Sequence, residues 1–312
     1  VTFDEVKAAL SAVDAFSINR GQYVNAGNAI SDEEIRSFIR AIDAPDTANS
    51  SGTILKLTLN YKPTDNLMVY GTYSEGFRPG LLNRPGGASN GTGYNVPFEV
   101  QTDEVTNIEL GWKADLLDGS MRFNGNIFFV NIDDLQTTIF DPSITNLFFS
   151  DNSADAGVTG LEADLLWAPI AIDGLTLSAA VSFLDSEITK VITPTNDVRL
   201  GDELAFAPKF QGNLQARYEW DLQSGLVAHV MPHVSHSAKS YSDIIRMNRD
   251  EIGGWTLLGV TAGITSDSWS AEFFVDNLTD ERAELSRNFV FDRQRVSYAM
   301  PRTTGMRFTK NF

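Results

Sequence analysis

Three histidines lie close together in the sequence and are the first candidates for metal binding or acid–base chemistry. His229 and His233 fall on the same side of an alternating segment, with Met231 between them, and His236 follows shortly after. On a β-strand, side chains four residues apart are roughly 13 Å from each other. That separation is too large for both imidazoles to bind one metal ion directly. We therefore expect the histidines to be structural residues that bond to neighbouring strands or to another part of the protein.

A serine hydrolase is the second chemistry that this stretch could support. It would need Ser235 or Ser237 as the nucleophile, with one of the histidines as its base. No sequence feature orients such a pair, so we expect no catalytic residue. The chain also has no cysteine, which excludes disulfide scaffolds, thiolate metal sites and cysteine nucleophiles.

Acidic residues outnumber basic ones by 41 to 24, giving a formal net charge of −17. This excess disfavours a nucleic-acid partner, because little could neutralise a phosphate backbone. Asp133-Asp134 and Asp202-Glu203 fall in or near long connections and could hold divalent ions, although we expect no metal and no cofactor. The acids within alternating segments lie opposite the apolar side, which does not indicate paired-carboxylate catalysis; they are Glu109, Asp115, Glu162, Asp164 and Glu219.

Two-residue alternation is the dominant pattern of the elements that carry these side chains. In the first clear segment, Leu57, Leu59 and Tyr61 share one side and the residues between them are polar. The pattern predicts about eleven strands, most of them ~10 residues long, the length that a tilted strand needs to cross a bilayer. These strands are 53–62, 66–76, 107–116, 121–130, 157–167, 174–184, 210–220, 225–235, 254–265, 268–278 and 302–312.

The connections between the predicted strands alternate in length. Short turns lie near 63–66, 117–119, 172–174, 223–225 and 266–268, and long polar segments lie at 78–101, 133–156, 187–206, 239–252 and 280–301. Outer-membrane barrels have short periplasmic turns and long outer loops. A soluble sandwich also alternates along its strands, but it has no reason to sort its loops by side. The sequence therefore predicts an all-β fold, a transmembrane antiparallel β-barrel.

Strand direction indicates that this chain is part of a larger barrel. If the short turns are periplasmic, the first and last strands both run inward. Closing them on each other would need a parallel seam, whereas bacterial single-chain barrels have an even number of antiparallel strands. We therefore expect further strands upstream, with 53–312 as the carboxyl-terminal half of a 22-stranded barrel. Residues 1–52 are expected to be an extracellular loop with a short helix over Ser31–Ile42, which has a capping box at Glu34.

Several segments carry recognisable motifs. The run LKLTLNYKPTDNLMVYGTYSEGFRPG at 55–80 reads as a strand, a turn and a second strand, and 102–136 contains an E-x-G-x-K hairpin. Both resemble segments of the TonB-dependent outer-membrane receptor family. Further matches are AGVTGLEADLLWAP at 156–169, DNLTDE at 276–281 and the terminal Phe312. Two features depart from the family: its amino-terminal plug domain is not in this sequence, and Lys310 falls on the lipid side of the last strand, where its amine could extend to the headgroups.

The resemblance implies an energy-coupled importer of a scarce ligand, most often a ferric siderophore, in the bacterial outer membrane. It further implies contact with outer-membrane lipid and lipopolysaccharide, and with a TonB-type inner-membrane coupling protein through the missing plug. A passive porin, an outer-membrane enzyme and a soluble carbohydrate-binding protein are the alternatives. Aromatic and basic residues in or beside the long loops could meet a ligand, but no site is assigned among them: Tyr94, Phe98, Phe148, Phe149, Tyr241 and Arg246.

Overall fold

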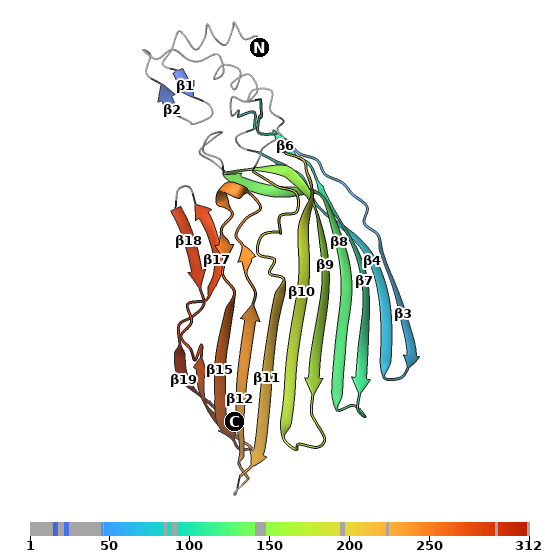
Figure 1. Ribbon diagram of the computed structural model, residues 1–312, viewed down its shortest axis with the longest axis vertical. Coiled ribbons are helices and arrows are strands. Elements are labelled where there is room, and N and C mark those ends of the chain that lie inside the picture. Colours follow the sequence, from blue (N-terminus) through green and yellow to red (C-terminus); the bar gives the residue numbers. More distant parts are fainter. Residues whose placement is uncertain are drawn as a thin grey trace.

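The computed structural model describes residues 15–17, 22–24, 45, 47–83, 86–88, 93–140, 148–193, 197–222, 225–290 and 293–310. Most of them belong to one antiparallel sheet of eleven strands, here called the wall (Figure 1). Within the described ranges, no helix is both long enough and apolar enough to cross a membrane. The predicted helix over Ser31–Ile42 lies outside the described residues, and the strands β1 (Ala15–Ser17) and β2 (Gln22–Val24) pair nearby in the sequence.

The wall confirms the predicted all-β fold and its strand number. Each strand is hydrogen-bonded to the next one along the sheet, in the order β3, β4, β7, β8, β9, β10, β11, β12, β15, β16, β19. Their bounds are Lys56–Thr64, Leu67–Arg78, Asp103–Leu116, Met121–Phe140, Phe148–Trp167, Leu175–Val191, Phe210–Asp221, Val227–Ser237, Trp255–Thr265, Trp269–Asp276 and Thr303–Lys310. The sheet curves into an open trough whose two edges are β3 and β19.

The connections are sorted by side, as the alternating loop lengths predict. Among the described residues, the short turns lie along the lower edge of the trough, and the long excursions lie along the upper edge (Figure 1). The described parts of these excursions form three two-stranded sheets and one short helix. They are β5 (Leu81–Leu82) with β6 (Glu99–Val100), β13 (Ser240–Tyr241) with β14 (Glu251–Ile252), β17 (Glu284–Val290) with β18 (Arg293–Tyr298), and η1 (Arg246–Asn248).

The prediction of a long polar loop at 133–156 is wrong for its described residues. β8 and β9 are each 20 residues long and remain paired from Met121↔Trp167 up to Phe140↔Phe148. Asp133 and Asp134 therefore lie within a strand. The polar sequence misled the prediction, because above the membrane both faces of a hairpin can carry polar side chains and the alternation fades.

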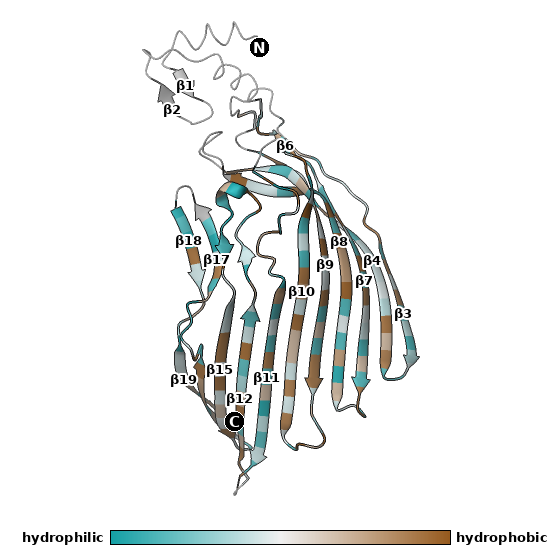
Figure 2. Cartoon of the chain, in the orientation of Figure 1, coloured by the Kyte–Doolittle hydropathy of each residue, from teal (hydrophilic) through white to brown (hydrophobic). Residues whose placement is uncertain are grey.

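One face of the wall is apolar and exposed. Its outward side chains alternate along each strand with polar ones on the opposite face, which Figure 2 shows as banding of the ribbons. A face that remains apolar without any protein covering it suits contact with lipid tails. Its exposed members include Leu57, Leu59, Tyr61, Val69, Ile108, Leu110, Ile127, Phe129, Phe183, Leu214, Tyr218, Trp220, Leu258, Phe273, Met306 and Phe308.

Aromatic side chains form two levels on this apolar face. Near the lower edge, three ring pairs have centroids 5.5–6.2 Å apart: Trp112–Phe123, Tyr218–Trp220 and Trp269–Phe308. Higher up, Phe210 contacts both Phe183 and His236. Phe210 and Tyr218 lie on the same strand, about 26 Å apart along it at the usual rise per residue. Aromatic girdles flank an apolar band of about 25 Å in outer-membrane barrels.

The buried apolar cluster of the described residues lies at the upper end of the wall, where β8, β9 and β10 extend into the excursions. We call segments 79–102, 133–156, 186–209 and 238–254 the outer cap. Ile188 and Ile245 are at most 2% exposed, and Phe149 is 3% exposed. Backbone bonds join the segments, from Arg246 N to Asp197 O (2.7 Å) and from Phe206 N to Tyr241 O (2.8 Å). The cluster comprises Ala88, Val96, Ile139, Phe149, Ala154, Ala156, Ile188, Val198, Ile244 and Ile245.

Candidate functional site

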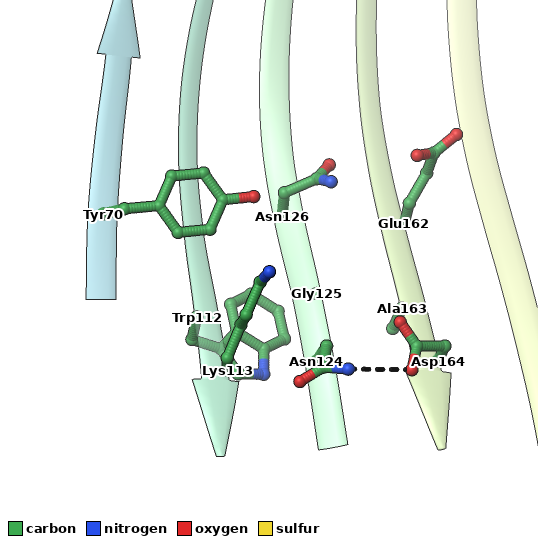
Figure 3. A pocket seen from close by; sticks show the side chains of 9 residues that line it. All are labelled: Tyr70, Trp112, Lys113, Asn124, Gly125, Asn126, Glu162, Ala163 and Asp164. Carbon is green, nitrogen blue, oxygen red and sulfur yellow. Dashed lines mark hydrogen bonds between the residues drawn. The ribbon is translucent and has the colours of Figure 1, made fainter. Parts of the chain in front are cut away.

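A polar hollow lies on the face of the wall opposite the apolar one, over β4, β7, β8 and β9 (Figure 3). The Tyr70 hydroxyl donates a hydrogen bond to Glu109 Oε1 at 2.5 Å, and Asn124 Nδ2 donates to Asp164 Oδ2 at 3.0 Å. The side chains of Lys113 and Glu162 make no hydrogen bond or ion pair with any described residue. Free charges of both signs suit a surface that faces water or a polar partner.

The histidines lie on the wall and do not converge. His229 and His233 lie on the polar face, where His229 Nε2 is 3.4 Å from Glu272 Oε1 and His233 Nε2 is 3.7 Å from Asp276 Oδ1. His236 lies on the apolar face, and its Nδ1 is 2.8 Å from Thr256 Oγ1. Across the described ranges, no group of three or more histidine, aspartate and glutamate side chains is placed to hold a metal ion.

The serines next to these histidines have other partners or none. Ser237 Oγ accepts a hydrogen bond from Gln211 Nε2 and lies 3.2 Å from the carbonyl oxygen of Ala238. Neither Ser235 nor Ser237 is hydrogen-bonded to a histidine among the described residues. A nucleophile needs a base within hydrogen-bond reach, so the geometry does not build a serine hydrolase.

Rings lie across glycines of the neighbouring strand at several points of the wall. A Cβ at Gly263 would collide with the His229 ring, and one at Gly259 would collide with the His233 ring. In both cases the ring and the glycine are direct cross-strand partners. Glycine within a strand often marks a close approach of this kind, a signal in the sequence that alternation alone does not capture. The other pairs are Tyr70 with Gly111, Trp112 with Gly125, Phe128 with Gly160, and Phe274 with Gly305.

Of the loop residues considered for ligand contact, Phe149 is part of the buried cluster. Tyr94 donates from its hydroxyl to Asp151 Oδ2 at 2.6 Å. Arg249 lies over the Tyr241 ring at 3.9 Å. Phe149 and Tyr94 thus hold different cap segments together, whereas the Tyr241 ring packs against its own excursion.

Other candidates remain accessible at the cap surface. Phe148 is 41% exposed, and the Arg246 side chain is 39% exposed while it pairs with Asp202 at 2.9 Å. Phe98 is half-buried beside Gly86. The cap therefore offers both an aromatic and a cationic group to solvent, from different excursions.

Two acids in the cap are perturbed by their surroundings. Burial raises the pKa of the Asp151 carboxyl above its ordinary value of 3.8, although the hydrogen bond from Tyr94 partly opposes the shift. Burial likewise raises the pKa of Asp243, against hydrogen bonds from the backbone of Ile245 and Ile244. Desolvation disfavours the charged form of an acid. Keeping either carboxyl ionised in the folded cap therefore costs free energy.

The chain matches a known family along most of its length. Residues 14–278 match the sequence profile of the family described as TonB dependent receptor-like, beta-barrel. A probable TonB-dependent siderophore receptor, PiuA of Acinetobacter baumannii, is 25% identical over 142 residues, which are 46% of this chain and 18% of that receptor.

Solved structures of similar fold include receptors for iron chelates. The ferric yersiniabactin uptake receptor FyuA of Yersinia pestis has a TM-score of 0.64 at 19% identity, covering 82% of this chain and 37% of that structure. The ferric preacinetobactin receptor BauA of Acinetobacter baumannii has a TM-score of 0.61 at 22% identity, covering 81% and 35%. The chain thus spans little more than a third of these structures, and the likeness concerns the fold.

Proposed function

Because this chain belongs to the family of TonB-dependent receptor-like β-barrels, we propose that it forms the wall and outer cap of a receptor that captures and imports a ferric siderophore or a similar chelate. The family consists of outer-membrane receptors and transporters, so the protein lies in the outer membrane and is not an enzyme. Within the proposal, residues 53–312 are the carboxyl-terminal portion of the barrel, and residues 1–52 are an extracellular loop.

The observation that carries the proposal is the vertical order of surfaces on the chain. An apolar exposed band lies between two aromatic levels, a polar face lies behind it, and a folded cap lies only at the edge with the long excursions. Such an order suits a channel that opens outward beneath a binding surface. The similar proteins FyuA, BauA and PiuA are a ferric yersiniabactin uptake receptor, a ferric preacinetobactin receptor and a probable siderophore receptor, which supports the same ligand class.

Import would need energy from the inner membrane. In the proposal, a TonB-type coupling protein pulls a plug within the channel, and the polar face around Lys113 and Glu162 faces that channel. Lipid tails contact the apolar band, and lipopolysaccharide surrounds the base of the cap.

Uptake by cells tests this function. The full coding sequence would be expressed in an outer-membrane receptor-deficient strain, and ⁵⁵Fe accumulation would be measured with catecholate, hydroxamate and citrate chelates. We expect saturable uptake of one class, abolished by an uncoupler of the proton gradient and by loss of the TonB-type protein. Uptake that is non-saturable and insensitive to the uncoupler would contradict the proposal and would indicate a passive porin.

A further inference from the structure

The hairpin formed by β8 and β9 bends where it leaves the wall. β8 stops pairing with β7 at Asp133↔Glu104, yet it stays paired with β9 up to Phe140. The register shifts between Ile132 and Gln136, and Asp134 adopts a positive φ of 55°. A β-bulge bends its strand and changes the direction of the residues beyond it. In Figure 1 the distal half of this hairpin, in green, leans away from the wall and lies across the upper edge of the trough.

A buried carboxylate lies at this bend. The Asp103 side chain, at the upper end of β7, is 1% exposed. It accepts hydrogen bonds from the backbone N (3.1 Å), Nε (2.8 Å) and Nη2 of Arg78, which ends β4. It also accepts one from the backbone N of Gln136, on the far side of the bulge, at 3.3 Å. One carboxylate therefore joins the β4–β7 pair to the distal half of β8.

Two amide side chains reinforce the same junction. Gln136 Nε2 donates to the carbonyl oxygens of Pro79 (3.1 Å) and Gln101 (3.0 Å). From β9, Asn152 accepts from Gln101 N at 2.8 Å and donates to Gln101 O at 2.9 Å. These bonds replace the backbone ladder at the place where β8 parts from β7.

We propose that Arg78 and Asp103 are positioning residues that hold the distal part of the β8–β9 hairpin, residues 135–140 paired with 148–153, bent across the mouth of the barrel. A buried carboxylate is stable only with a well-placed partner, and an arginine fork supplies two donors in a fixed geometry. The bend therefore has one strongly preferred angle. This assigns a role to Arg78 within the Gly-Phe-Arg-Pro-Gly run at 76–80.

The consequence for ligand capture rests on the proposed function. The bent hairpin carries Phe149 into the buried cluster and Asp151 to Tyr94. It thereby brings together excursions that follow β4, β10 and β12. If the angle is lost, these segments separate and the binding surface is assembled only part of the time.

Pulsed electron-spin distance measurements test the proposal. Residues 1–312 contain no cysteine, so, once any cysteine elsewhere in the receptor is replaced, spin labels can be placed by Thr138→Cys, on the exposed side of the hairpin, and Leu258→Cys, on the wall. In the full-length receptor in lipid nanodiscs, we expect a narrow distance distribution. Asp103→Asn and Arg78→Gln should broaden it at least twofold, and Arg78→Lys should restore part of the narrow population. Asp115→Asn, an exposed carboxylate at the other end of β7, should change nothing.

A second measurement separates positioning from general stability. Heat-dependent mobility in gels would first show that the barrel of each variant is intact. Asp103→Asn should then weaken chelate binding about tenfold, as expected when the binding-competent arrangement is populated about a tenth of the time. Asn152→Ala, on the other side of the bend, should act in the same direction. A narrow, unchanged distance distribution in Asp103→Asn and Asn152→Ala would overturn the proposal. If Asp103→Asn broadens the distance distribution but the unsubstituted receptor binds no chelate, the role of Asp103 in fixing the bend is upheld and the proposed function is refuted.

Discussion

The wall and the outer cap are stabilised in opposite ways. In the wall, large apolar side chains such as Leu214 and Phe273 point away from the protein and are 46–47% exposed. In the cap, Ile188 and Ile245 are buried among residues from other excursions, and they are at most 2% exposed. β8, β9 and β10 run through both regions. The lower part of each strand exposes its apolar side chains, and the upper part buries them in the cap.

Each region draws its stabilising free energy from a different source. The wall is stabilised by contact of its apolar side chains with lipid and by hydrogen bonds between strands. In every strand with two neighbours, these bonds pair the backbone N–H and C=O groups. The cap gains from burial of apolar surface away from water, as a soluble domain does. Each region should therefore respond to a different kind of substitution, and four predictions use this contrast.

The largest effect is expected from a cavity in the cap. Ile188→Ala should destabilise the cap by about 2–5 kcal/mol, the usual cost of removing a buried isoleucine side chain. Hydrogen exchange should accelerate in the cap segments and remain slow in the lower halves of β11 and β12. Leu200→Ala is the control, because Leu200 is 68% exposed in the same excursion as Val198. Equal acceleration in the wall would mean that the two regions unfold as one.

A charge on the apolar face should affect only the wall. Leu214 lies midway between the aromatic levels, and Leu214→Arg should cost about 2–4 kcal/mol of barrel stability in lipid. The adjacent Gln215 lies on the polar face of the same strand, so Gln215→Arg should cost much less. Urea titration of refolding into vesicles measures both. If the two substitutions have the same effect, the assignment of faces is wrong.

A smaller effect is expected where a ring crosses a glycine. Gly263→Ala would place a Cβ against the Ala271 carbonyl oxygen and the His229 ring, and overpacking of this kind costs about 1–3 kcal/mol. Gly76→Ala is the matched substitution within the wall, because nothing lies within 4 Å of its added Cβ. The midpoint of thermal unfolding in detergent should fall for the first variant and stay constant for the second.

The smallest effect is a pH dependence confined to the cap. The pKa values of Asp151 and Asp243 are raised by burial in the folded cap, so the folded state binds protons more tightly than the unfolded state between the ordinary 3.8 and the raised values. Stability must then increase as the pH falls into that window. Lysines of the cap with raised pKa values, Lys209 and Lys239, stay charged throughout and do not contribute.

Proteolysis of the cap checks this sign. Cleavage within residues 133–156 should slow as the pH is lowered from 7 towards the ordinary carboxyl pKa of 3.8, and Asp151→Asn should remove part of the dependence while slowing cleavage at pH 7. Cleavage that accelerates on acidification would contradict the raised pKa values of these two carboxyls, provided that the protease is calibrated on an unfolded peptide at each pH.

Much of the wall could be predicted from the sequence, because alternation and turn spacing are local signals. The even positions from Phe210 to Trp220 are apolar or small, and their odd neighbours are polar, which determines the faces of β11 without any tertiary information. Lys310 was expected on the lipid side, and it pairs with Trp269 at the lower end of that face. The glycines opposite rings were an available signal that periodicity alone does not use.

The cap could not be predicted in the same way. Ile188, Ile244 and Phe149 meet from three excursions, and nothing local in any one of them specifies the other two. Asp103 shows the same limit: its partner Arg78 is 25 residues away, and in the sequence both look like ordinary loop-edge charges. Burial of a charge depends on long-range packing, so the structure was needed to find it.

Spin-label accessibility along β11 would show which face of the wall contacts lipid. Single cysteines from 210 to 220 would be labelled in the full-length receptor in lipid bilayers, and their collision rates with oxygen and with a water-soluble nickel chelate would be measured. We expect oxygen maxima at Phe210, Leu214 and Tyr218, nickel maxima at Gln211, Gln215 and Glu219, and a period of two throughout. Accessibility without alternation, or even positions shielded from both reagents, would contradict a wall whose apolar face contacts lipid.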